Sequence, residues 1–199
     1  MMRRGLISAF ILATPLALGA CMTGPGPVDV TRFHLGQPIE RGSVIVEPAP
    51  GGLDADSLEF KTYGDAVMGQ LRRVGYAPAE QLGTSLYVAV IRIDRDEREA
   101  VVQKSPVSVG LGGSTGSYGG GVGGGISFGI GGKPKSTLVT QLSVQLKRRS
   151  DQSVVWEGRA VTEVSEKSEA AQPSATAARL AAGLFGDFPG ESGRTIRVK

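Results

Sequence analysis

Two glycine-flanked serines are the first residues in this sequence that could do chemistry. Ser114 and Ser127 both fit the Gly-x-Ser-x-Gly pattern, which exposes a serine nucleophile on a strand-to-helix turn and needs a histidine later in the chain. The only histidine, His34, precedes both serines, and no helix-forming run follows either one. Since more than half of the residues from 110 to 132 are glycine, we interpret both motifs as chance matches and predict no catalytic residues.

The sequence also lacks the usual patterns of phosphate loops and metal sites. Lys133 is followed by Pro134, where a phosphate loop needs Ser or Thr. His34 has no Cys, His or clustered carboxylate at ligand spacing, so we interpret it as a structural residue on a strand. The acids between 94 and 99 alternate with arginines, which indicates a solvated, internally paired strand end and not a calcium loop. We therefore predict no cofactor and no metal.

The only cysteine, Cys21, stands between an apolar run and a segment rich in Gly and Pro. The apolar run from Leu6 to Leu18 is shorter than the roughly 20 residues that a membrane-spanning helix needs. Arg3 and Arg4 precede it, which gives the positive start that is typical of a secretory signal. The beginning of the chain therefore predicts export across a membrane.

The residues just before the cysteine, Leu18-Gly19-Ala20, make this segment resemble a bacterial lipobox. The resemblance implies a signal peptide at 1–20, cleavage before a lipidated Cys21, and an anchor with a short tether at 21–27. Several acyl chains would hold the protein on a membrane permanently. Met22 is not the Asp that is associated with inner-membrane retention, which favours the outer membrane. The alternatives are an ordinary secretory signal with a chance cysteine, or a buried cysteine.

The charge balance of the chain argues against a nucleic-acid partner. Without residues 1–20, which hold two arginines, the chain has 20 basic and 19 acidic residues. The densest basic cluster, Lys147 to Arg149, is expected to end a strand or form a turn and not to bind phosphates. A chain with one cysteine cannot form an internal disulfide. The remaining length of about 179 residues suffices for one domain with a hydrophobic core.

Hydrophobic periodicity and turn residues predict the elements of that domain. We expect strands at 28–35, 42–50, 85–93, 136–149, 153–164 and 193–198, and helices at 57–74 and 173–186. The strand at 85–93 is expected to continue into the charged run that follows it, and the two strands after 136 to form a long hairpin.

The first of these helices has a clear apolar stripe. Its members recur at helical spacing, and they are Phe60, Tyr63, Val67, Leu71 and Val74. Asp56 followed by Glu59 is typical of a capping box, which would start the helix. We expect the stripe to pack on the sheet, and we expect Trp156, the only tryptophan, to lie in the core or at its edge.

The order of elements predicts a single α+β domain from 28 to 199, with a largely antiparallel or mixed sheet and two helices packed on one face. The order is β-β-α-β, a glycine-rich hairpin or loop, and β-β-α-β. Together with the lipobox, the stretches "SLEFKTYGDAVMGQLRRVGY", "DQSVVWEG" and "FGDFPGESGRTIRV" make the chain similar to the domain of unknown function 4136 lipoproteins of Gram-negative bacteria. That resemblance implies a periplasm-facing lipoprotein with an α/β sandwich and no agreed activity.

The glycine-rich insertion at 107–132 has two interpretations. It could be a flexible loop, or a hairpin, because apolar residues alternate with small ones on both sides of it. In a hairpin, one face would be apolar and could contact a partner. The candidate interaction residues are Val109, Leu111, Tyr118, Ile126, Phe128 and Ile130.

These observations favour a non-enzymatic lipoprotein of the bacterial cell envelope, facing the periplasm and acting as a structural or protein-docking module. Its expected partners are the membrane, through the lipid anchor, and an envelope protein, but no nucleic acid. The alternative is a carrier of a small ligand or lipid, with a pocket between helices and sheet. A carrier needs an unfilled cavity, whereas a docking module can be packed throughout and should expose an apolar patch.

Overall fold

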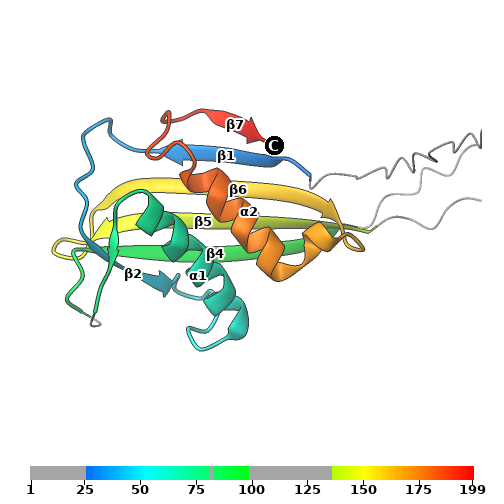
Figure 1. The fold of residues 1–199 in the computed structure, drawn as a ribbon, viewed down its shortest axis with the longest axis horizontal. Coiled ribbons are helices and arrows are strands. Elements are labelled where there is room, and N and C mark those ends of the chain that lie inside the picture. Colours follow the sequence, from blue (N-terminus) through cyan, green and yellow to red (C-terminus); the bar gives the residue numbers. More distant parts are fainter. Residues whose placement is uncertain (1–25, 81–82, 99–135) are drawn as a thin grey trace, which may run out of the picture.

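In the computed structural model, which describes residues 26–80, 83–98 and 136–199, the strands form one mixed sheet with the order β3-β2-β4-β5-β6-β1-β7 (Figure 1). The strands are β1 (Val28–Phe33), β2 (Ser43–Pro48), β3 (Ala77–Pro78), β4 (Tyr87–Arg98), β5 (Thr137–Arg148), β6 (Val154–Ser165) and β7 (Thr195–Val198). The helices are α1 (Leu58–Arg73), α2 (Pro173–Phe185) and the short 3-10 turn η1 (Glu169–Ala171). The predicted α+β class, with one sheet and two α-helices, is confirmed.

The sheet combines antiparallel and parallel pairs. The pairs β4–β5, β5–β6, β6–β1 and β1–β7 are antiparallel. β2 is parallel to β3 and β4, because α1 returns the chain to the end of the sheet where β2 began. The two-residue β3 was not predicted, since its sequence is too short to show a strand pattern.

One face of the sheet carries the hydrophobic core. Along β5 every second residue from Thr140 to Leu146 is buried, while the residues between them are half-buried. Both α-helices lie over this buried face (Figure 1) and pack against each other and the strands. Trp156 of β6 is fully buried and stacks on Phe185 of α2, with ring centroids 5.2 Å apart, so its predicted core position is confirmed.

Helix α1 starts one residue later than predicted and uses a different cap. Its N-cap is Ser57, whose hydroxyl accepts a hydrogen bond from the Phe60 backbone N–H at 3.1 Å, so the capping role predicted for Asp56 was wrong. A serine oxygen satisfies one of the free N–H groups at a helix start. The apolar stripe does face the core as predicted: Val67 and Leu71 have no exposed surface.

A buried arginine joins β1 to the end of α2. Arg32 is 3% exposed, and its guanidinium donates hydrogen bonds to the carbonyls of Gly183 at 2.7 Å and Leu184 at 2.8 Å. The last carbonyls of a helix lack partners within the helix and carry partial negative charge, which a cation stabilises. The pKa of Arg32 is lowered from its ordinary value because burial disfavours the charged form, and the negative charge of Asp187 offsets part of this effect.

The charged end of β4 forms an ion pair with a helix, which the sequence did not predict. The strand runs to Arg98, as expected, but in the described residues the ion pair of this segment links Arg95 to Glu59 of α1, at 3.2 Å. Arg95 also donates to the Tyr63 hydroxyl at 3.3 Å. Residues 94–98 form no ion pair with one another, contrary to the pairing predicted within this run, while Glu99 lies outside the described residues.

His34 lies one residue beyond β1 and not on the strand. Its Nε2 lies 2.9 Å from the Gly190 carbonyl, and its Nδ1 accepts a hydrogen bond from the Gly36 backbone N–H. Both ring nitrogens therefore contact the backbone, which ties the loop after β1 to the loop before β7. No helix of the described segments is both long and apolar enough to span a bilayer.

Candidate functional site

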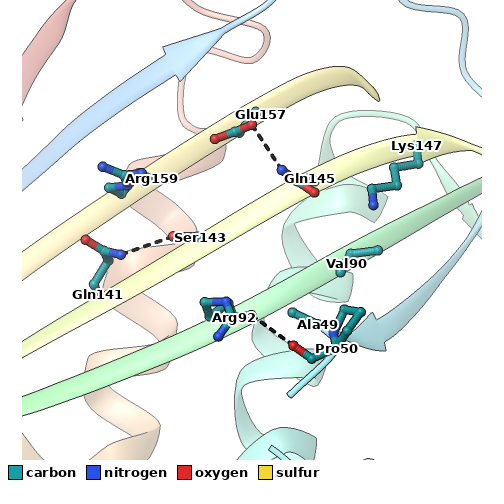
Figure 2. A pocket seen from close by; sticks show the side chains of 10 residues that line it. All are labelled: Ala49, Pro50, Val90, Arg92, Gln141, Ser143, Gln145, Lys147, Glu157 and Arg159. Carbon is teal, nitrogen blue, oxygen red and sulfur yellow. Dashed lines mark hydrogen bonds between the residues drawn. The ribbon is translucent and has the colours of Figure 1, made fainter. Parts of the chain in front are cut away.

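The face of the sheet opposite the helices, here called the open face, holds a polar hollow of about 310 Å³. Figure 2 shows it over β4, β5 and β6, with the helices behind the sheet. It is lined by Ala49, Pro50, Val90, Arg92, Gln141, Ser143, Gln145, Lys147, Glu157 and Arg159. These side chains come mainly from alternate strand positions, because successive residues of a strand point to opposite faces.

Strand register places two arginines on either side of a serine. Arg92 of β4 is the partner of Ser143 on β5, and Ser143 is the partner of Arg159 on β6. Figure 2 shows the two arginines on the outer strands of this trio, with Ser143 between them. Neighbouring strands lie about 4.8 Å apart, so long side chains from β4 and β6 can reach the space above β5.

Several polar side chains of the hollow hold one another in place. Gln145 donates to the Glu157 carboxylate at 3.1 Å, and Gln141 donates to the Ser143 hydroxyl at 3.3 Å. Arg92 donates to the Pro50 carbonyl at 2.9 Å, which ties it to the loop after β2. These contacts fix the directions in which the side chains of Gln145, Gln141 and Arg92 point.

The cations of the hollow exceed its acids. Its lining contains Arg92, Lys147 and Arg159 but only one acid, Glu157. Within the part of the chain that the structure describes, the side chains of Lys147 and Arg159 have no hydrogen-bond or ion-pair partner. The hollow therefore has free donors and a local positive charge.

A second hollow of about 490 Å³ lies at the other end of the open face, near the start of β1. Its lining includes Arg197 and Asp29, which form a two-point ion pair at 2.7 and 2.9 Å. The hydrogen bond from Arg197 lowers the pKa of Asp29. The lining of this hollow holds two basic residues, Arg98 and Arg197, and two acids, Asp29 and Glu163, so it lacks the excess of positive charge of the first hollow.

An apolar surface lies at the end of the sheet where β1 ends and β6 begins. Leu35 is 84% exposed and Val154 is 43% exposed. The two residues line one small hollow of about 120 Å³, whose other members are the apolar Pro38, Ile39 and Val155 and the polar Gln37, Arg148 and Ser153. Phe33, at the end of β1, is 53% exposed. We call the apolar residues of this set the apolar end. β1 starts at the opposite end of the sheet, beside the end of β6 (Figure 1), and Gly26 precedes it by two residues.

The side chains on these surfaces determine what they can bind. The polar hollow offers guanidinium, ammonium, amide and hydroxyl groups, which can hold polar or anionic groups. The one carboxylate of its lining, Glu157, accepts a hydrogen bond from Gln145. Among the described residues, no three His, Cys, Asp or Glu side chains are grouped so that they could hold a metal ion.

Comparison with known proteins places the chain in a family. The family model described as "Domain of unknown function (DUF4136)" matches residues 46–190. The chain belongs to this family. It is 29% identical to "Uncharacterized protein ZMO1243" of Zymomonas mobilis subsp. mobilis, an alignment that covers 96% of this chain and 85% of that protein. The recognition of the DUF4136 family from the sequence is thus confirmed.

Two solved structures are distantly similar to this DUF4136 chain. The PelC dodecamer from Paraburkholderia phytofirmans has a TM-score of 0.45 at 18% identity, covering 83% of this chain and 99% of that one. A PDZ domain protein from Parabacteroides distasonis has a TM-score of 0.46 at 8% identity, covering 87% of this chain and 39% of that one.

The site residues predicted from the sequence lie outside the described residues. These are the lipidation site Cys21 and the candidate interaction residues Val109, Leu111, Tyr118, Ile126, Phe128 and Ile130. The open face was not predicted as a site, although the polar half of the alternation in β5 was visible in the sequence. The polar side of β5 lies between Arg92 and Arg159 because of the strand register, which the sequence alone does not give.

Proposed function

We propose that this DUF4136 protein is a non-enzymatic lipoprotein of the bacterial cell envelope, anchored through Cys21 and facing the periplasm, where it docks an envelope protein. The anchor rests on the lipobox-like residues before Cys21 and on the positive, apolar segment ahead of them. We place the protein on the outer membrane because Met22 follows the cysteine. The short tether at 21–27 would hold the domain close to the lipid surface.

The apolar end is the observation that carries the docking role. An apolar side chain in water gains free energy when a partner covers it, at roughly 25 cal/mol per Å². Leu35, Phe33 and Val154 are exposed on one end of the sheet, and β1, which follows the tether, starts at the other end. A partner in the periplasm could therefore reach the apolar end without competing with the anchored segment.

The packing of the core weighs against the alternative, a carrier with a pocket between helices and sheet. In the described residues this space is filled by large side chains that are less than 2% exposed, among them Trp156, Tyr63, Leu71 and Leu180. A ligand would have to displace them, which costs their packing energy. The polar hollow and the hollow at the apolar end both lie outside this core.

The proposal is tested by cross-linking cells, solubilising the envelope in detergent and identifying co-purified proteins by mass spectrometry. We expect Leu35→Ser to reduce recovery of a partner, while Leu58→Ser leaves it unchanged. Leu58 is a matched control because it is 82% exposed, as Leu35 is 84% exposed, but it lies at the start of α1. Equal recovery with wild type and both variants would contradict docking at the apolar end.

A further inference from the structure

We propose that the polar hollow is a phosphoryl-binding site, in which Arg92, Ser143 and Arg159 hold the three terminal oxygens of a phosphate group. This inference is independent of the docking role, since these residues lie on the open face and not at the apolar end. It rests on the register of three strands, on the free donors of the hollow and on its charge.

The three residues lie in one row across the sheet. Arg92 pairs with Ser143, and Ser143 pairs with Arg159, without a bulge in this part of the ladder. The two arginine backbones are therefore about 10 Å apart, twice the strand spacing of about 4.8 Å. Two extended guanidinium groups can approach one anion above the serine from opposite sides.

Each member of the row has a donor to offer. Arg159 has no side-chain partner among the described residues. Arg92 is oriented by one hydrogen bond to the Pro50 carbonyl and keeps other N–H groups, because a guanidinium has five. The Ser143 hydroxyl already accepts from Gln141, so its own hydrogen is available to a ligand.

The number of donors and the charge favour a phosphoryl group. A phosphate monoester has three terminal oxygens and a charge between −1 and −2 near neutral pH, whereas a carboxylate has two oxygens and one charge. Lys147 adds a third cation at the rim, and Glu157 is turned toward Gln145. Arginine pairs are well suited to phosphate because their planar N–H groups match its oxygens.

The phosphoryl group could be carried by a soluble molecule or by a lipid headgroup, and the test separates these sources. The full-length chain in non-ionic detergent is titrated with glycerol 1-phosphate, and separately with mixed micelles with and without phosphatidic acid. Binding is followed by calorimetry. An Arg159-dependent signal with glycerol 1-phosphate supports a soluble ligand, and one seen only with phosphatidic acid supports a lipid.

The matched variants are Arg159→Gln and Arg73→Gln. Both remove one exposed arginine charge, but Arg73 lies at the end of α1. We expect Arg159→Gln to weaken binding by about tenfold or more, since a hydrogen bond to a charged group contributes about 1.5–3 kcal/mol. Arg73→Gln should bind as wild type does. Ser143→Ala should weaken binding less than Arg159→Gln, because it removes a neutral donor.

Three results would overturn the proposal. These are equal affinity of the two arginine variants, acetate binding as tightly as glycerol 1-phosphate, or no binding in either arm. Circular dichroism of each variant shows whether it is folded. If Arg159→Gln does not fold, Arg92→Gln takes its place and carries the same expectation, because Arg92 lies on the opposite side of Ser143.

Discussion

Replacing Arg32 with methionine should destabilise the fold by removing the link between β1 and α2. The substitution keeps a long side chain but loses two hydrogen bonds from a charged donor, to Gly183 and Leu184. Each is worth about 1.5–3 kcal/mol, and the two carbonyls would lose their partner. Relief from burying a cation offsets part of the loss. We expect a net cost of about 3 kcal/mol.

The assay is thermal unfolding followed by circular dichroism. For a domain of this size, about 1 kcal/mol lowers the midpoint by about 2–4 °C, so Arg32→Met should lower it by about 6–12 °C. Arg197→Met is the control, because Arg197 is exposed and pairs with Asp29 at the surface, where ion pairs contribute little. If Arg32→Met unfolds at the same temperature as Arg197→Met, the guanidinium does not hold the end of α2.

Three further predictions follow from the core, from one buried phenol and from the anchor. Val67→Asp would place an unpaired charge in the core and cost several kcal/mol; an unchanged midpoint would contradict the burial of Val67. Burial raises the pKa of Tyr76 to about 12, so the unfolded state releases this proton first and stability should fall between about pH 10 and 12. Urea unfolding at pH 8 and 11 should show a smaller alkaline loss in Tyr76→Phe, and equal losses would contradict the assignment. Cys21→Ser should abolish labelling by a fatty-acid probe, and equal labelling of wild type and variant would remove the evidence for lipidation.

The elements that the sequence predicts correctly are those with a long local pattern. The stripe of α1 spans four turns, so the burial of Val67 and Leu71 follows from helical spacing. The alternation in β5 similarly identifies its buried and polar sides. Trp156 was placed in the core because it lies within an apolar strand. In these cases each residue's environment depends on its neighbours in sequence.

The features that sequence reasoning missed depend on contacts between distant segments. Arg32 is buried because carbonyls about 150 residues away accept its hydrogen bonds, and a lone arginine on a strand gives no sign of that. Arg95 similarly pairs with Glu59 across the α1–β4 contact and not with the acids beside it. The position of Arg159 depends on the register of β6, because a shift by one residue would place its side chain on the other face of the sheet.

The central claim, that the apolar end docks an envelope protein, is tested most directly by photo-cross-linking in living cells. A photoreactive residue is placed at Leu35 in one strain and at Asp65, on the exposed side of α1, in another. We expect a discrete cross-linked protein with the probe at position 35 and none with the probe at position 65. The same cross-linked protein at both positions, or at position 65 alone, would contradict it.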